Sequence, residues 1–373
     1  MSQMSADWVV KRLDDVLKLE YGKPLPKEDR DDNGEYPAYG ANGIKCRTNR
    51  FYRNKPSIIV GRKGSAGEVN LSADKFWPLD VTYFVDYDEE HYDRMFLYYC
   101  LLSLKLQSLA KGVKPGINRN DVYAIERAFP PLPEQKRIVA ILDEAFAAIS
   151  QAVANAEKNL ANARELFESY LNNVFEKKSD EWEEKPLGQI CENLDSKRIP
   201  ITKAKRESGD IPYYGASGIV DYVADYIFNE ELLLVSEDGA NLLARTYPIA
   251  FSITGKTWVN NHAHVLRFEN KETLQFVEYY FNSISLEPYV SGMAQPKLNQ
   301  KALNSIPVPL PDLLEQKRVV KIFNALAKEI QHLETIYQQK LTALAELKQS
   351  ILQKAFSGEL TADASSIMED TVA

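Results

Sequence analysis

The chain contains the stretch Pro130-Pro131-Leu132-Pro133-Glu134-Gln135-Lys136-Arg137, whose last four residues return 181 positions later as Glu315-Gln316-Lys317-Arg318. The second copy also follows a proline-rich segment, Pro307-Val308-Pro309-Leu310-Pro311. Proline is well tolerated in the first turn of a helix, and the helix dipole favours an acidic side chain there. Each copy therefore predicts the start of a helix.

Neither proline nor glycine occurs in the windows that follow, Glu134 to Lys185 and Glu315 to Ser357. Apolar residues recur there at alternating spacings of three and four, as in a coiled coil, and only Lys340 interrupts the second series. We expect the two helices to pack side by side in opposite directions. The predicted pairing residues are Leu142, Phe146, Ile149, Val153, Leu160, Phe167, Phe323, Leu326, Ile330, Leu333, Leu344 and Ile351.

The repetition extends outward from these helices in both directions. Trp8 and Leu13 are matched by Trp182 and Leu187 at an offset of 174 residues. Further pairs follow in order, at offsets of 175 and then 181: Pro37 with Pro212, Tyr39 with Tyr214, Gly43 with Gly218, Val60 with Val235, Trp77 with Trp258, Pro115 with Pro296 and Asn118 with Asn299. So many ordered matches indicate an internal duplication.

The part of each repeat that precedes its helix mixes short apolar runs with Gly, Pro and Asn, and has helical patches near Asp93 to Leu109 and Lys271 to Ser283. The sequence therefore predicts an α+β fold with two similar domains, separated by two long antiparallel helices that form a coiled coil, with pseudo-twofold symmetry. The expected segments are domain 1 at 1-133, a central helix at 134-178, domain 2 at 179-314, a second helix at 315-357 and a flexible tail at 358-373.

The net charge of -8 argues against indiscriminate binding to nucleic acid, which requires a basic excess. The two domains differ, because residues 1–133 carry 20 Lys+Arg and 19 Asp+Glu, whereas residues 179–314 carry 12 and 19. The second domain would need a local basic patch or a partner protein to hold phosphates.

Other features of the sequence point to a cytoplasmic protein that does not contact a membrane. The first fifteen residues carry charges where a secretory signal would be apolar, and no run of 18 apolar residues occurs. Cys46, Cys100 and Cys191 lack the spacing of a zinc site or a disulfide framework.

Motifs of catalysis are missing: the sequence has no Walker A motif, no Gly-x-Gly-x-x-Gly and no Asn/Asp-Pro-Pro-Tyr. Pro311-Asp312 followed by Glu315-Gln316-Lys317 resembles a nuclease signature, but these acids crowd together at a predicted helix start. His262 and His264 alternate as metal ligands on one strand face would, but no third ligand is evident in the sequence, so a structural role is favoured. We therefore predict no catalytic residues and no metal site in this chain.

The segment Gly61 to Gly67 could cradle a phosphate with its backbone N–H groups. The second repeat, however, has Ser236, Glu237 and Asp238 where the first has Gly61, Arg62 and Lys63. This difference favours a turn that both copies share but that carries different side chains in each copy. It therefore indicates that the two domains bind different ligands.

Two Tyr-Gly-x-x-Gly-Ile segments, at Tyr39 and Tyr214, and two Glu-Gln-Lys-Arg segments with long helices make the chain resemble the specificity subunits of type I restriction-modification systems, from Trp8 to Gly358. The resemblance implies a non-catalytic subunit whose two target-recognition domains each read one half of a split, asymmetric site in double-stranded DNA. The paired helices would set the gap between the halves, since about 43 residues of helix span on the order of 65 Å and one DNA turn about 34 Å.

The resemblance also implies partners: two modification subunits that methylate adenine, and restriction subunits. S-adenosylmethionine, ATP and Mg would bind those partners, and no cofactor is expected in this chain. Two alternatives remain open: a duplicated coiled-coil adaptor for other proteins, and the recognition subunit of an enzyme whose cutting and methylating activities share one partner polypeptide.

Family members differ in their contact residues, so the choice of contacts rests on polar and basic residues in loops near the glycines. The residues predicted to contact DNA are Tyr39, Asn42, Arg62, Lys63, Lys114 and Asn118 in the first domain, and Tyr214, Ser217, Lys256, Gln295, Lys297 and Asn299 in the second.

Overall fold

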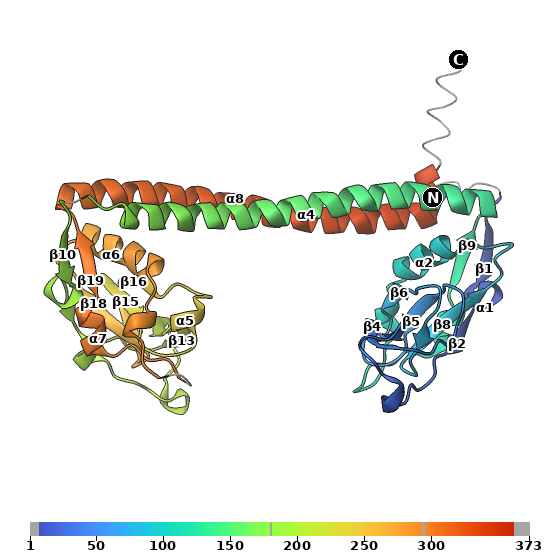
Figure 1. Ribbon diagram of the computed structural model, residues 1–373, viewed down its shortest axis with the longest axis horizontal. Coiled ribbons are helices and arrows are strands. Elements are labelled where there is room, and N and C mark those ends of the chain that lie inside the picture. The colour runs from blue at the N-terminus through green and yellow to red at the C-terminus, as the bar shows by residue number, and fades with distance from the viewer. Residues whose placement is uncertain (1–6, 180, 293–294, 362–373) are drawn as a thin grey trace, which may run out of the picture. The chain divides into compact units, whose positions relative to one another are not determined.

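The computed structural model describes residues 7–179, 181–292 and 295–361. It divides into two compact units, of which unit 1 comprises Met1–Ala156 and Gln339–Ala373, and unit 2 comprises Glu157–Gln338. Two long helices, α4 (Leu132–Glu176) and α8 (Leu313–Ser357), each begin in one unit and end in the other (Figure 1). Each unit thus combines a globular part with the start of one long helix and the end of the other.

Two small sheets and a strand pair form the globular part of unit 1. One sheet has the order β2, β8, β5, β6 with antiparallel neighbours, and in the other β3 pairs antiparallel with β4 and parallel with β7. The strands are β1 (Val9–Arg12), which pairs with β9 (Glu126–Phe129), and β2 (Leu17–Tyr21), β3 (Tyr36–Gly40), β4 (Gly43–Thr48), β5 (Ile58–Gly61), β6 (Val69–Leu71), β7 (Trp77–Pro78) and β8 (Thr82–Tyr87).

Unit 2 has the same arrangement with one further strand, β14, in its second sheet. One sheet has the order β11, β18, β15, β16, and the other has the order β13, β12, β17, β14 with β12 and β17 parallel. The strands are β10 (Glu183–Pro186), which pairs with β19 (Pro307–Leu310), and β11 (Glu192–Asn193), β12 (Ile211–Gly215), β13 (Gly218–Val223), β14 (Phe228–Asn229), β15 (Leu232–Ser236), β16 (Ala250–Ile253), β17 (Lys256–Val259) and β18 (Ala263–Arg267).

Strand register repeats as well as strand order. Ala38 lies opposite Trp77 in the parallel pair of unit 1, and Tyr213 lies opposite Trp258 in that of unit 2. A β-bulge follows Ala38 in one hairpin and Tyr213 in the other. The predicted duplication of one α+β domain is therefore confirmed down to an irregularity in the backbone.

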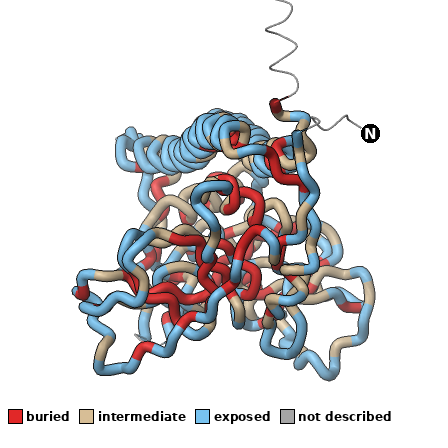
Figure 2. Tube along the Cα trace, turned by 90° about the vertical axis from the view of Figure 1, so that its right-hand side faces the viewer, coloured by how far each residue is buried: buried red, intermediate tan, exposed pale blue. Residues whose placement is uncertain are grey.

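One helix in each unit, α2 (Arg94–Ser103) or α6 (Lys271–Ser283), packs against the long helices through aromatic rings. The ring centroids of Tyr99 and Phe146 lie 5.4 Å apart in unit 1, and those of Phe276 and Phe175 lie 5.5 Å apart in unit 2. Buried segments, red in Figure 2, lie inside the globular parts. The shorter helices are α1 (Leu13–Val16), α3 (Arg119–Tyr123), α5 (Asn241–Ala244) and α7 (Gln300–Ser305), and the 3-10 turns are η1 (Lys27–Asp29), η2 (Leu106–Leu109), η3 (Leu187–Gln189), η4 (Asp195–Lys197), η5 (Lys203–Lys205) and η6 (Glu287–Tyr289).

The long helices run antiparallel in unit 2. Phe175, near the end of α4, contacts Phe323, near the start of α8, whereas Arg164, earlier on α4, pairs with Glu334, later on α8, at 2.5 Å. In unit 1, Lys348 of α8 lies over the Phe146 ring of α4. Among the predicted pairing residues, Leu142, Phe146, Ile149, Phe323 and Ile330 are buried, and Val153, Leu160, Phe167, Leu326, Leu344 and Ile351 are partly buried.

The second apolar series differs from the prediction in its later half. Leu333 is 37% exposed, and Leu347 is 47% exposed. Leu341 is partly buried beside the exposed Lys340, so the packed face continues through that residue. An α-helix has 3.6 residues per turn, so a strict seven-residue repeat slowly rotates around the helix surface. The packed face therefore moves from the position of Lys340 to that of Leu341.

The segment expected to be a flexible tail is partly ordered. Leu360 packs against the core of unit 1, and Thr361 is only 7% exposed. The remaining residues of that segment, 362–373, lie outside the described part of the chain.

One stretch of α4 is long and apolar enough to span a membrane, with a mean hydropathy of 1.4. Apolar side chains near the start of this helix, including Leu142, Phe146 and Ile149, are buried in the core of unit 1. Of the apolar stretch, 22% is buried within the protein.

The glutamine of each repeated Glu-Gln-Lys-Arg is buried at the start of a long helix. The side-chain amide of Gln135 donates to the carbonyls of Pro130 and His91 at 2.9 and 3.0 Å, and its oxygen accepts from the N–H of Asp93 at 2.9 Å. Gln316 donates to the carbonyl of Pro311 and accepts from the hydroxyl of Thr273, both at 2.7 Å. Each glutamine ties the start of a long helix to the start of α2 or α6.

The acids of the nuclease-like segment serve the same helix start. Asp312 accepts a hydrogen bond from the N–H of Glu315 at 2.8 Å, as a helix-capping side chain does. Glu315 lies in the first turn of α8 and accepts two hydrogen bonds from Arg318 at 2.7 Å. The interpretation of this segment as a helix start is confirmed.

We predict that Gln135→Met destabilises the chain by roughly 1–3 kcal/mol, because methionine preserves volume but leaves buried donor and acceptor groups without partners. The free energy of unfolding in denaturant measures the effect. Lys136→Met, at the exposed neighbouring position, is the control and should stay within about 0.5 kcal/mol of the unchanged chain. Equal effects of the two substitutions would show that the glutamine does not fasten the helix.

Candidate functional site

Three loops of unit 1 meet at the end of β5. The N–H of Gly64 donates to the carbonyl of Pro115, and the N–H of Ile117 donates to the carbonyl of Arg62, both at 3.0 Å. Gly61 approaches the β3–β4 turn so closely that a Cβ there would lie 2.9 Å from the carbonyl oxygen of Ala41. We call the turn at 41–42 and the loops at 62–68 and 110–117 the first loop cluster.

The equivalent loops of unit 2 meet in the same way. The N–H of Gly239 donates to the carbonyl of Pro296 at 3.0 Å, and the N–H of Leu298 donates to the carbonyl of Glu237 at 2.8 Å. The hydroxyl of Ser236 donates to the carbonyl of Ala216 at 2.5 Å. The turn at 216–217, the loop at 237–240 and the described residues of the loop at 291–298 form the second loop cluster, on the same backbone frame as the first.

Four residues predicted to contact DNA lie in the first loop cluster. Asn42, Lys63 and Lys114 are exposed. Within the described part of the chain, neither lysine forms an ion pair. The Arg62 guanidinium donates to the carbonyl of Asp80, so part of its donor capacity is already used.

In the second loop cluster Ser217 and Gln295 are exposed, and Lys297 is exposed but forms an ion pair with Glu237 at 3.2 Å. Lys256 lies outside these loops, on β17, where its ammonium sits over the Tyr226 ring. The structure thus brings together seven of the twelve predicted contact residues, counted as four in the first cluster and three in the second.

Four other predicted contact residues have structural roles. Asn118 and Asn299 occupy equivalent positions and cap α3 and α7, each by accepting a backbone N–H at 3.0 Å. Tyr39 is buried, and its hydroxyl accepts the N–H of Ala73. Tyr214 is partly buried against Phe251. All four recur at equivalent positions of the two copies, which fits a role in the shared fold.

Two polar residues of this region were not among the residues predicted to contact DNA. His262, half exposed, donates from Nδ1 to both carboxylate oxygens of Asp238 at 2.9 Å. Asp238 stands where Lys63 stands in the first copy, and each forms an isolated bridge to the neighbouring loop. The signal that could have found this pair was the reversal of charge between equivalent positions.

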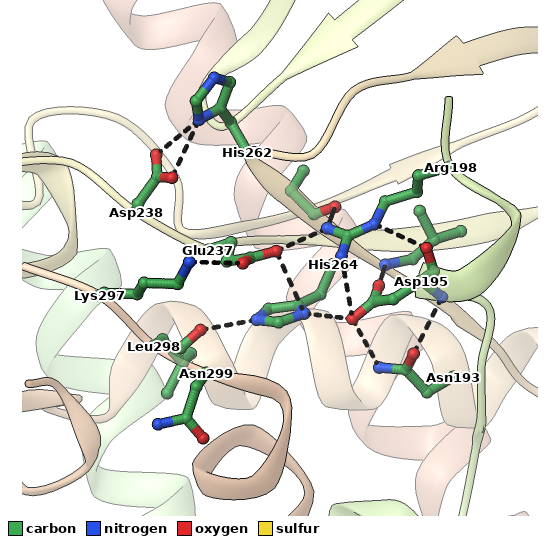
Figure 3. A network of polar contacts seen from close by, with 12 residues as sticks. Asn193, Asp195, Arg198, Glu237, Asp238, His262, His264, Lys297, Leu298 and Asn299 are labelled. Atoms are coloured by element: carbon green, nitrogen blue, oxygen red, sulfur yellow. Dashed lines mark hydrogen bonds and ion pairs between the residues drawn. The ribbon is translucent and has the colours of Figure 1, made fainter. Parts of the chain in front are cut away.

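Below the second loop cluster lies a buried polar network (Figure 3). His264 is 1% exposed and faces Asp195 through Nδ1 at 2.6 Å and the carbonyl of Leu298 through Nε2 at 2.7 Å. Arg198 donates to Glu237 at 2.6 Å, and Lys297 pairs with the same carboxylate. The network joins η4, β15 and β18 to the loop that carries Lys297.

Asp195, Glu237 and His264 are three metal-ligand types within 4.8 Å of one another, although no third ligand was evident from the sequence. Both ring nitrogens of His264 already face acceptors, which a doubly protonated ring satisfies. Two cationic side chains hold the Glu237 carboxylate. The arrangement fits an ion-pair network better than a metal site, and His262 belongs to a separate pair.

Burial disfavours the charged form of Asp195, but the hydrogen bond to His264 and the charges of His264 and Arg198 outweigh it, so that the pKa of this carboxyl is lowered. The ionised carboxylate is therefore the form that holds the network together. Its location under the loops means that the shape of the second loop cluster depends on this charge.

Comparison with known proteins shows the family. Residues 5–158 and 179–342 each match the type I restriction modification DNA specificity domain. A Haemophilus influenzae protein named as a type I restriction enzyme specificity subunit is 37% identical over 158 residues, which are 42% of this chain and 40% of that protein. The Escherichia coli EcoDI specificity subunit is 24% identical over 96% of this chain and 90% of its own length.

Solved structures show the same fold. A chain from a structure described as the complex assembly and conformational transition of the type I R-M system has a TM-score of 0.77 at 17% identity, covering 96% of this chain and 100% of that one. The HsdS subunit of Thermoanaerobacter tengcongensis has a TM-score of 0.57 at 19% identity, covering 96% and 98%.

We predict that Asp195→Asn lowers the free energy of unfolding at neutral pH by roughly 1–3 kcal/mol, since buried cationic partners lose their carboxylate. A lowered folded pKa gives stability that is present above the unfolded value of about 3.9 and is lost as the pH falls through the folded pKa. The variant should therefore lose less stability below about pH 4 than the unchanged chain. Denaturant unfolding between pH 3 and 7 measures this, with the exposed Glu269→Gln as control, and parallel losses would contradict it.

Proposed function

The chain belongs to the type I restriction-modification DNA specificity family and carries the family's domain twice, and we propose that each domain reads one half of a bipartite, asymmetric site in double-stranded DNA. In this role the chain recognises DNA and contains no catalytic centre. Adenine methylation, DNA cleavage and the binding of S-adenosylmethionine, ATP and Mg belong to partner subunits.

The observation that carries the proposal is the pair of loop clusters. Equivalent backbone hydrogen bonds, Gly64 to Pro115 and Gly239 to Pro296, have the same length of 3.0 Å. The side chains at equivalent positions of that shared frame differ, with the exposed Lys63 in one copy and the partly buried Asp238 in the other. Phosphate contacts position a protein on DNA, whereas contacts to base edges specify the sequence. Different side chains on equivalent loops therefore suit two different half-sites.

The long helices would set the gap between the half-sites and carry the modification subunits. Apolar residues of both helices are buried in the core of each unit, which supports paired helices as the spacer. A groove of about 310 Å³ in unit 2, lined by Trp182, Arg318, Ile322 and neighbouring residues, leaves apolar surface available at the start of α8. Two modification subunits, one for each repeat, and restriction subunits complete the proposed assembly, which works in the cytoplasm.

The direct test is to express this chain together with its modification partner and to sequence the methylome. We predict adenine methylation at one split sequence, with two fixed halves separated by a gap of fixed length. Replacing residues 1–133 by the corresponding domain of another family member should change one half only. Loss of sequence preference in every combination would favour a protein adaptor, and a change in both halves would contradict separate reading.

A second prediction concerns the helical spacer. Insertion of seven residues into both helices, next to Arg164 and Glu334, preserves the packed faces and adds about 10 Å. The gap in the methylated sequence should lengthen by up to about three base pairs at about 3.4 Å each, with both halves unchanged. Insertion of seven residues into the 362–373 segment is the control and should leave the gap as it was. An unchanged gap after the helical insertion would remove the spacer role.

A further inference from the structure

We propose that Asp238 and His262 form a base-reading pair of the second domain, in which the Asp238 carboxylate accepts a hydrogen bond from the exocyclic amino group of a cytosine or adenine in the major groove. The proposal rests on the DNA-reading function proposed above. It names a residue that determines specificity and the chemical group that it recognises.

Asp238 cannot bind phosphate as its counterpart Lys63 can, because its side chain is negatively charged. Lys63 is exposed and carries a positive charge that phosphate attracts. Asp238 occupies the same place on the same frame, but its carboxylate only accepts hydrogen bonds, and phosphate oxygens also only accept. On the surface of DNA, the donors that a carboxylate can use are base amino groups. Cytosine N4 and adenine N6 lie in the major groove, which is wide enough to admit protein elements, and guanine N2 lies in the narrower minor groove.

His262 holds this carboxylate in place. Its Nδ1 lies 2.9 Å from both oxygens of Asp238, while the side chain of Asp238 remains 18% exposed. An ionised carboxylate has about four lone-pair positions, so capacity remains for a second donor. Because the side chain is already oriented, reading a base costs less conformational entropy than it would for a free aspartate.

The buried network supports the loop from below. Glu237, next to Asp238 in the chain, pairs with Arg198 at 2.6 Å and with Lys297 at 3.2 Å, and its carbonyl accepts the N–H of Leu298. Figure 3 shows the Asp238–His262 pair beside this network. Gly239 then turns with φ of +106°, a conformation that suits glycine, and its N–H reaches the carbonyl of Pro296. Both neighbours of Asp238 are therefore fixed.

The same assignment explains the unequal charge of the two domains. The first loop cluster has Lys63 and Lys114 available for phosphate. The second cluster has Lys297, but Glu237 already pairs with it. The first domain and the partner subunits would therefore supply most of the phosphate neutralisation, and the second domain would contribute discrimination between bases.

The experiment uses the complex with its modification subunits and compares the methylated sequences of Asp238 variants. Asp238→Ala should relax base preference at one position of one half-site, by roughly 10- to 100-fold in relative methylation. Asp238→Asn keeps the shape of the loop and adds donors, so it should change which base pair is preferred at that position and raise adenine methylation of sites that carry a different base pair there. Glu269→Gln, an exposed change elsewhere on the domain, is the matched control and should leave the sequence unaltered.

The base pair selected at that position by the unchanged complex identifies the amino group, with a C·G pair indicating cytosine N4 and an A·T pair indicating adenine N6. Unaltered preference in both Asp238 variants would overturn the proposal, as would a change confined to the half-site that residues 1–133 determine. Lys63→Ala, at the equivalent position, should instead weaken DNA binding about equally on all sequences. It should also reduce the slope of log affinity against log salt concentration by about one, the amount expected for one lost phosphate contact. If the unchanged complex methylates no split sequence, the proposed function itself fails, and that result is seen before any variant is compared.

Discussion

Burial of the apolar faces of α4 and α8 is the constraint on which the rest of the structure depends. Neither 45-residue helix can cover its own apolar face, and in each unit the other helix and the globular part cover it together. The rings of Phe175, Phe276 and Phe323 in unit 2, and of Phe96, Phe146 and Phe356 in unit 1, belong to these shared cores. A domain without its helices would expose these rings to water, at a cost that rises with the apolar area exposed.

Gln135 and Gln316 fix the geometry at the start of each long helix, where that helix joins the core. A buried amide without partners is costly, whereas one that is fully hydrogen-bonded stabilises a single geometry. Each glutamine bonds both to the proline segment that precedes its helix and to the start of α2 or α6. The most recognisable motif of the chain is therefore structural, and the divergent loops at the far end of β5 and β15 carry the proposed recognition.

Sequence reasoning succeeded for features that repeat. The duplication, the two helix starts and the α+β class follow from residues that recur at fixed offsets, and the structure repeats the strand order and the bulges. Tyr39, Asn118 and Asn299 were predicted to contact DNA because they are polar and lie near the glycines, and in the structure these residues pack or cap helices. Residues retained in both copies serve the shared fold, and residues such as Lys63 and Asp238 that differ are the better candidates for recognition.

The sequence by itself determined that one unit occurs twice, where each long helix begins, and which broad class of fold and family the chain has, because these depend on local periodicity and on residue identity. Only the tertiary structure decided that Asp195, Arg198, Glu237 and His264 form one buried network with the exposed Lys297 at its edge, and that His262 orients Asp238. These residues are up to about a hundred positions apart in the chain. Their contacts depend on how β11, β15 and β18 align, and no local pattern of residues encodes that alignment.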